Sequence, residues 1–139
     1  MVVDVPGFTP GYARAGDAGA DLRVTEAVTL QPGERALVGT GVRIALPEGT
    51  VGLVTPRSGQ AMRRGLGIVN SPGIIDSGYR GEIRVCLINL DTTTAVELQA
   101  GERVAQLVVV PFVSAQFLPV DELDETERGQ GGYGSTGQQ

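Results

Sequence analysis

The stretch from Asn70 to Ile83 places a carboxylate and an aromatic ring close together among turn residues. Asp76 is a candidate general base, because a carboxylate can orient and deprotonate a water molecule, and Tyr79 offers a ring beside it. We expect Gly73 to supply a positive φ at a first turn, and Gly78 the same freedom at a second. The stretch predicts a hairpin with a reactive group near its tip, although an ordinary surface turn also fits.

A second group of residues has the chemistry of an anion site. Arg57, Ser58 and Gly59 offer a guanidinium, a hydroxyl and backbone N–H groups at the start of a short predicted helix, residues 58–64. Unpaired N–H groups and a guanidinium bind phosphate oxygens well. We expect Ser58 to cap this helix and Gly65 to end it. A capped helix with a solvated arginine is the alternative.

Two further polar residues stand among small or apolar neighbours. Asp21 follows Gly19 and Ala20, and it is a candidate for holding Mg²⁺ through water, since Mg²⁺ keeps several of its waters. A loop aspartate with no ligand is equally compatible. Gln106 lies between Ala105 and Leu107 in a predicted strand and must therefore face away from both. Its amide is a candidate phosphate contact or an ordinary polar strand residue.

The C-terminal segment combines flexibility with groups that bind phosphate and stack on bases. Residues 129–137 contain five glycines, too little apolar surface to order alone. Arg128, Ser135 and the backbone at Gly134 are candidate phosphate contacts, and the Tyr133 ring is a candidate partner for a base. The alternative is a frayed terminus.

The absence of one residue type removes whole reaction classes. The chain has no histidine and one cysteine, Cys86. This excludes Ser-His-Asp and Cys-His nucleophile systems and the His/Cys/Cys zinc site of deaminases. Cys86 lies in a strand-like run and is expected to be buried. Carboxylates, arginines, hydroxyls, backbone groups and a hard metal ion remain.

Short β-prone runs between glycine and proline turns are expected to position these groups. They predict an all-β jelly roll or barrel with one short helix and a flexible glycine-rich C-terminal arm. Residues 42–46 show the alternation of a half-buried strand. The runs cover residues 28–30, 35–38, 42–46, 51–55, 83–90, 95–98 and 104–113.

Composition sets the wider limits. The 139 residues fit one domain, and we expect residues 1–120 to form it and residues 121–139 to form an acidic linker and arm. The net charge of −5 argues against general nucleic-acid binding. No apolar run is long enough to span a membrane, and the N-terminus lacks the layout of a signal peptide. We therefore expect a cytoplasmic protein with no membrane or nucleic-acid partner.

Five stretches, in this order and spacing, resemble the motifs of the homotrimeric dUTP pyrophosphatase (dUTPase) family. Together they cover most of the chain, from about Ala15 to Gly137. The stretches are residues 18–22 (AGADL), 56–66 (beginning PRSG), 70–82 (NSPGIIDSGYRGE), 103–107 (RVAQL) and 128–137 (RGQGGYGSTG).

The resemblance implies a function as well as a fold. It implies a jelly-roll or barrel trimer with three active sites at subunit junctions, and Mg²⁺-dependent attack of water on the α-phosphate of dUTP, which gives dUMP and pyrophosphate. Such an enzyme keeps uracil out of DNA and supplies dUMP for thymidylate synthesis. Each site would combine the first, second and fourth motifs with the third motif of another subunit and the tail of the third.

The resemblance also assigns roles to nucleoside-binding residues. Asp76 matches the carboxylate that activates water and holds the 3′-hydroxyl. Tyr79 matches the ring under the deoxyribose that excludes a 2′-hydroxyl. Asn70 and the backbone at Gly73 and Ile75 match the uracil contacts.

The remaining roles concern the phosphates, the metal and the tail. Asp21 matches the residue that holds Mg²⁺ through water. Tyr133 matches the ring over uracil, where phenylalanine is commoner. The residues that match phosphate contacts are Arg57, Ser58, Gly59, Gln106, Arg128, Gly134 and Ser135.

Two other functions remain open at this point. One is a dCTP deaminase of the same superfold, for which the Tyr133-to-Thr136 tail and the residues around Asp76 are less typical. The other is a nucleotide-dependent binding or signalling protein that keeps the pocket. Two departures from the family pattern, Gly78 where aspartate is common and Gln60 where leucine is frequent, remove no proposed catalytic group.

Overall fold

The computed structural model describes residues 2–3 and 8–132, and they form an all-β fold with one short helix. The all-β prediction is confirmed. Strands that alternate buried and exposed residues form most of the body, as in β9 (Arg84–Asn89), where Val85 and Leu87 face inward. The helix α1 spans Ser58–Arg64.

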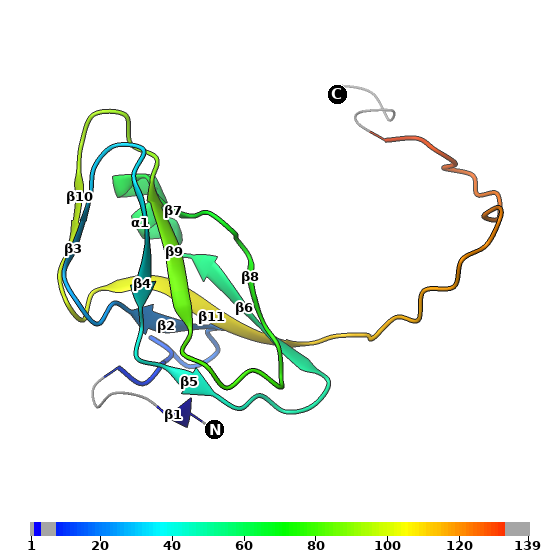
Figure 1. Ribbon diagram of the computed structural model, residues 1–139, viewed down its shortest axis with the longest axis horizontal. Helices are drawn as coiled ribbons and strands as arrows, with labels where there is room; N and C mark the ends of the chain where they lie inside the picture. The colour runs from blue at the N-terminus through cyan, green and yellow to red at the C-terminus, as the bar shows by residue number, and fades with distance from the viewer. Residues whose placement is uncertain (1, 4–7, 133–139) are drawn as a thin grey trace.

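Two sheets carry most of the core. The larger has the order β2-β11-β6-β8 and the smaller the order β4-β9-β7, with all neighbours antiparallel. Figure 1 shows β4 and β9 side by side, crossing in front of β2 and β11. The strands are β2 (Gly19–Arg23), β4 (Arg35–Gly39), β6 (Thr50–Pro56), β7 (Leu66–Ile68), β8 (Gly73–Ile75), β9 and β11 (Arg103–Pro111).

Two smaller pairs complete the described part of the fold. β3 (Val28–Leu30) pairs with β10 (Val96–Leu98), and β1 (Val2–Val3) pairs with β5 (Arg43–Ile44). Asn89, at the end of β9, is fully buried, and its Nδ2 donates to the carbonyls of Leu30 and Thr94. This amide ties the β3–β10 pair to the smaller sheet.

The core lies between the sheets and takes side chains from both. Leu22 comes from β2, Leu107 from β11, and Leu66 and Leu87 from the smaller sheet, and all are buried. Burying such side chains contributes about 1.5–3 kcal/mol each to folding. Cys86, expected to be buried, is only partly so, because it alternates with Val85 and Leu87 and faces the other side of β9.

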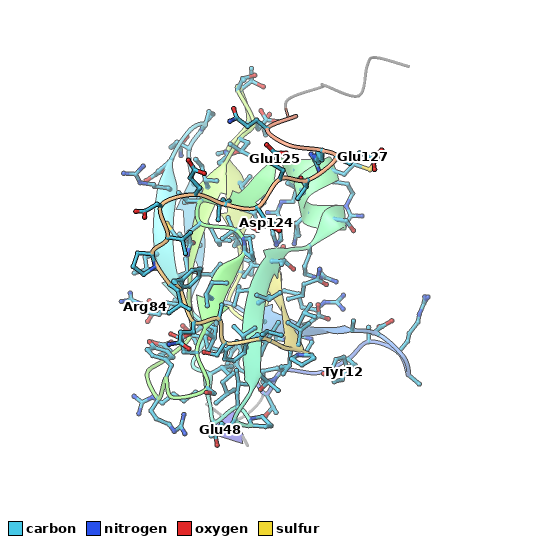
Figure 2. The ribbon with its side chains drawn as sticks, turned by 90° about the vertical axis from the view of Figure 1, so that its right-hand side faces the viewer. Tyr12, Glu48, Arg84, Asp124, Glu125 and Glu127 are labelled. Carbon is cyan, nitrogen blue, oxygen red and sulfur yellow. The ribbon has the colours of Figure 1, made fainter. Side chains whose placement is uncertain are left out.

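The residues after β11 lie outside the body. Figure 1 shows residues 112–132 leaving the end of β11 and curving away, and they form no helix or strand. Figure 2 looks onto this side and labels Asp124, Glu125 and Glu127 of the acidic run along the exposed segment. The division of the chain at residue 120 stays a prediction. No helix in the described residues has the length and apolar character needed to cross a membrane.

Candidate active site

The stretch that was expected to be a hairpin instead joins the two sheets. β8 pairs with β6, with Ile75 opposite Gly52, whereas β9 pairs with β4 and β7. The hairpin prediction is therefore wrong. The two arms diverge because each finds its backbone partners in a different sheet, and a cavity opens between them.

The turn geometry also differs from the prediction. Neither Gly73 nor Gly78 is among the glycines with a positive φ. The Ser71–Pro72 peptide bond is cis, and Gly73 begins β8 as a buried residue with extended backbone. At position 73, glycine is therefore suited to the limited space around it and is not needed for a left-handed turn.

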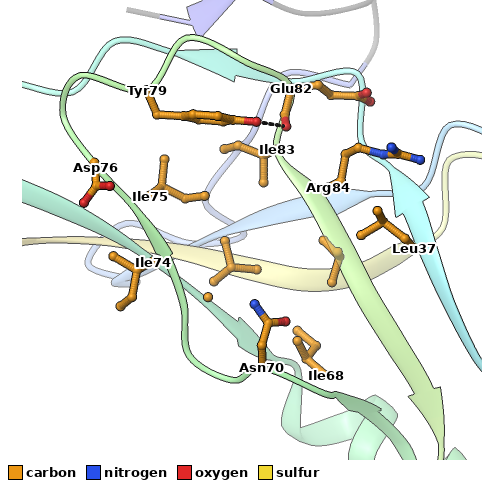
Figure 3. Close-up of a pocket in the computed structure, with 13 residues that line it drawn as sticks. Leu37, Ile68, Asn70, Ile74, Ile75, Asp76, Tyr79, Glu82, Ile83 and Arg84 are labelled. Carbon is orange, nitrogen blue, oxygen red and sulfur yellow. Dashed lines mark hydrogen bonds between the residues drawn. The ribbon is translucent and has the colours of Figure 1, made fainter.

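The cavity between the arms has a volume of about 350 Å³ and is called the nucleoside cavity below. Asp76 and Tyr79 line its mouth, and Asn70 lies at the other end (Figure 3). Val54 and Ile83, both buried, contribute to its apolar wall. A flat apolar ring with polar edges fits such a site.

All five predicted residues of this stretch line the nucleoside cavity: Asn70, Gly73, Ile75, Asp76 and Tyr79. The cavity is also lined by Glu82 just before β9, Arg84 at the start of β9 and Leu37 on β4, which were not predicted from the sequence. Leu37 could be found only through the pairing of β4 with β9, which local sequence does not reveal.

A second cavity, of about 580 Å³, lies against β2, β11 and the start of α1 and is called the phosphate cavity below. It shares no lining residue with the nucleoside cavity. All five residues predicted for phosphate or metal contact line it: Asp21, Arg57, Ser58, Gly59 and Gln106. It also includes Asp17 and Arg63, which were not predicted.

Strand register brings Asp21 and Gln106 together on one face. They are direct partners in the β2–β11 pair. Ala105 and Leu107 are buried, which confirms that Gln106 faces the other way. The Gln106 Nε2 donates to the Pro56 carbonyl at 3.3 Å. A Cβ added at Gly19 would lie 2.5 Å from Gln106 Oε1, so glycine there leaves room for this amide.

The Asp21 carboxylate bridges two guanidinium groups. Its Oδ1 lies 2.9 Å from Arg57 Nε and its Oδ2 lies 3.1 Å from Arg103 Nη1. A β-bulge at the start of β11 lets Val104 and Ala105 both face the core and returns Arg103 to the face of Asp21. Regular alternation would have buried Arg103, so a sequence pattern alone does not find it.

The helix α1 begins at Ser58, with Arg57 at its N-cap position and no side-chain cap. The prediction that Ser58 caps the helix is wrong, and its hydroxyl remains exposed at the phosphate cavity. N–H groups of the first turn have no partner within a helix. Gly65 ends the helix with φ of 63°, as predicted.

Gln60 anchors α1 to the start of β11. It is 7% exposed, and its Nε2 donates to Glu102 Oε1 at 3.2 Å and to the Arg103 carbonyl at 3.1 Å. Arg64 Nη1 binds the same carboxylate oxygen at 2.5 Å. Gln60, for which no consequence was predicted, thus holds the helix beside Arg103 and hence beside Asp21.

The charge of Glu102 is stabilised in the folded chain. Burial would raise its pKa, but hydrogen bonds from the Gln99 N–H and from Gln60 and Arg64 outweigh this and lower the pKa of Glu102 below its ordinary value. A lowered pKa contributes stability above the unfolded pKa, and this stability is lost as the pH falls through the folded pKa.

We expect the stability difference between the wild type and Glu102→Gln to shrink as the pH falls below about 4.3. Unfolding by denaturant at pH 7, 5 and 3.5 measures this. Glu97→Gln, an exposed glutamate of the neighbouring β10, is the control. A difference that stays constant across this range would contradict the assignment.

The remaining predicted residues lie in the tail. Arg128 lines neither cavity, and its Nε donates to the Gly131 carbonyl at 3.0 Å. Tyr133, Gly134 and Ser135 lie outside the described residues.

The described residues contain no cluster of three or more side chains from the metal-ligating types. Two carboxylates, Asp17 and Asp21, line the phosphate cavity. This donor set fits an ion that keeps most of its waters and takes other ligands from phosphate groups, as Mg²⁺ does.

Comparisons with known proteins agree with this geometry. The family model for dUTPase matches residues 7–137. The deoxyuridine 5′-triphosphate nucleotidohydrolase of Cutibacterium acnes is 65% identical over 97% of this chain and 89% of its own length.

Two solved structures are similar along most of the chain. The Staphylococcus bacteriophage 80alpha dUTPase with dUPNHPP matches with a TM-score of 0.90 and 31% identity, covering 99% of this chain and 97% of that one. An aspartate-to-asparagine mutant of the phage phi11 dUTPase, described with a structural Mg(II) ion, matches with a TM-score of 0.81 and 28% identity, over 90% and 98%. With the family model and this identity to curated relatives, the chain belongs to the dUTPase family.

Proposed function

We propose that this chain hydrolyses dUTP to dUMP and pyrophosphate in a homotrimer with shared active sites. The observation that carries the proposal is the division of the predicted site residues between two separate cavities. One has the shape and polarity for a nucleoside and the other the charges for phosphates. A complete site then forms where the nucleoside cavity of one subunit faces the phosphate cavity of another.

Exposed apolar side chains on the strands support subunit contacts. Leu37 is 53% and Ile74 58% exposed, and Val109 on β11 is also exposed. Surfaces of this kind commonly mark interfaces between subunits. Cyclic symmetry would repeat the same junction three times and so create three sites.

The nucleoside cavity is proposed to select the base and the sugar. Asn70 and the backbone at Gly73 and Ile75 pair with uracil, and the Tyr79 ring packs under the deoxyribose. Cytosine reverses the hydrogen-bond pattern and would leave buried polar groups unpaired. Asp76 orients and deprotonates the attacking water and accepts from the 3′-hydroxyl.

The phosphate cavity is proposed to neutralise the triphosphate. Arg57, the Ser58 hydroxyl, the Gly59 N–H and the second Gln106 amide hydrogen provide donors on one wall. Preorganised donors of this kind stabilise the charge that develops as water attacks the α-phosphate. Mg²⁺, when bound, would neutralise phosphate charge there, and Asp21 would hold one of its waters.

The tail is proposed to close over the bound nucleotide of a neighbouring site. Arg128, Gly134 and Ser135 would contact the γ-phosphate, and Tyr133 would stack over uracil. The exposure of residues 112–130 supports an arm that orders only on ligand or on another subunit. A cytoplasmic enzyme without membrane or nucleic-acid partners stays our prediction.

Pyrophosphate release from dUTP, dCTP, dTTP and UTP with Mg²⁺ at equal concentration tests the activity. We expect fast release from dUTP alone. Release of pyrophosphate from dCTP, together with ammonia, would instead identify the protein as a dCTP deaminase. Binding of dUTP without release would favour a nucleotide-binding role.

Complementation tests the shared site. Asp76→Asn and Arg57→Ala subunits are each expected to be nearly inactive alone. After random equimolar assembly, about a quarter of all sites join an intact Asp76 to an intact Arg57 from the neighbouring subunit and recover activity. Recovery after the two variants are unfolded and refolded together, compared with each alone, is the measurement. No recovery in confirmed mixed trimers would place both groups on one subunit.

Gly73→Ala tests the fit of the nucleoside cavity. The added Cβ would lie 3.4 Å from Val54 Cβ and 3.7 Å from Asn70 Nδ2, so the fold accommodates it while space beside the base is lost. We expect KM for dUTP to rise about tenfold or more, with an unchanged unfolding midpoint. Steady-state kinetics and thermal unfolding measure the two effects, and an unchanged KM would contradict the placement of the base.

A further inference from the structure

The Tyr79 ring lies directly over Gly81. A Cβ added at Gly81 would lie 2.6 Å from Cζ and 2.9 Å from Cε2 of the ring, closer than real Cβ atoms approach other atoms. Gly81 is not among the glycines with positive φ. The ring, and not the backbone conformation, therefore requires glycine at this position.

The ring is held in this place by the loop around it. The Tyr79 hydroxyl donates to the Glu82 carbonyl at 2.9 Å (Figure 3), and the Tyr79 N–H donates to the Asp76 carbonyl at 3.0 Å. Arg80 Nη1 donates to the carbonyls of Ser77 and Tyr79 at 2.7 and 2.8 Å. These bonds fix the loop, so a larger residue at position 81 displaces the ring. Tyr79 is 43% exposed and lines the nucleoside cavity.

We propose that Gly81 is a specificity-determining positioning residue that sets the height of the Tyr79 ring and thereby the selection of 2′-deoxyribose over ribose. The inference rests on the proposed function. Because Gly81 has no side chain, the Tyr79 ring rests against the loop backbone and packs closely under the sugar. A methyl group there breaks the bond to the Glu82 carbonyl and pushes the ring into the nucleoside cavity or away from the sugar.

The test compares Gly81→Ala with Gly78→Ala. Gly78 lies in the same loop, has nothing within 4 Å of an added Cβ and lines neither cavity, so its variant is the matched control. We expect Gly81→Ala to lower the ratio of kcat/KM for dUTP to that for UTP about tenfold or more, and Gly78→Ala to leave it unchanged. An unchanged ratio in folded Gly81→Ala would overturn the proposal.

A double-mutant cycle shows whether Gly81 acts through the ring. In a Tyr79→Ala background, Gly81→Ala is expected to change the ratio less than about twofold, because the added methyl group meets no ring. A full effect in that background would overturn the proposal. If Gly81→Ala alone fails to fold, the clash predicts that the double variant folds, and its failure would equally overturn it.

A binding measurement separates this inference from the proposed activity. If the wild type binds nucleotide but does not release pyrophosphate from dUTP, the proposed function fails. The ratio is then measured as the Kd for dUpNHpp against that for its ribose counterpart. A rise of that ratio in Gly81→Ala, but not in Gly78→Ala, would support the inference, and an unchanged ratio would overturn it.

Discussion

Asp76→Asn is expected to bind dUTP nearly as tightly as the wild type and to turn it over about 10²–10⁴-fold more slowly. Asparagine keeps the shape of the side chain and removes its ability to accept a proton. Asp76 is exposed directly after β8, and no hydrogen bond or ion pair of its carboxylate is observed within the described residues. The substitution therefore costs the fold little.

Single-turnover kinetics and calorimetric titration with dUpNHpp separate the two effects. Glu48→Gln is the control, because Glu48 is an exposed carboxylate on the turn before β6 and lines neither cavity (Figure 2). Near-normal turnover by Asp76→Asn would remove the carboxylate from the chemical step. Loss of binding with unchanged turnover of the bound nucleotide would make Asp76 a sugar contact alone.

Truncation after Glu127 is expected to lower kcat/KM for dUTP about 10²–10³-fold and to leave the trimer intact. The lost segment holds Arg128 and the residues proposed to contact the γ-phosphate, and removing such donors typically has an effect of this size. Residues 112–127 remain in this variant, so the segment between β11 and the point of truncation is unchanged.

A second truncation, after Gly132, keeps Arg128 and removes the proposed contacts beyond it. A smaller loss for this variant would assign part of the effect to the guanidinium. Sedimentation velocity reports the oligomeric state of both. A monomeric product would make the tail a structural clasp between subunits and would contradict its role as a closing arm.

Local sequence was sufficient for the helix and for most of the strands, although β1, β2 and β7 were not predicted. Alternation placed Val42 and Ile44 on the inner face, and the helix-forming run and Gly65 gave the bounds of α1. The predicted strand at residues 83–90 corresponds to β9, which is one residue shorter at each end, and that at residues 104–113 to β11, which begins one residue earlier and ends two residues earlier. The alternation of buried and exposed residues and the secondary-structure propensity both depend on a few neighbouring residues, so a short stretch of sequence is enough to predict them.

Pairing between distant strands was not predictable in this way. Ile75 finds Gly52 and not the chain beyond Tyr79, because β6 offers a longer partner than a local hairpin would. The bulge that turns Arg103 toward Asp21 depends on the register of β11 against β2. The Gln60 contact with Glu102 joins segments 42 positions apart. Each of these features follows from tertiary structure.

The divergence of β8 and β9 links ligand recognition to the integrity of the core. Val54, Ile83 and Val85 form the wall of the nucleoside cavity and are also members of the hydrophobic core, with exposures of 3%, 0% and 1%. A base seated there completes the packing between two sheets, much as an additional core side chain would. Substitutions that reshape the cavity for a different base will therefore trade thermal stability for selectivity, and compensating changes are to be sought on the opposite side of these residues.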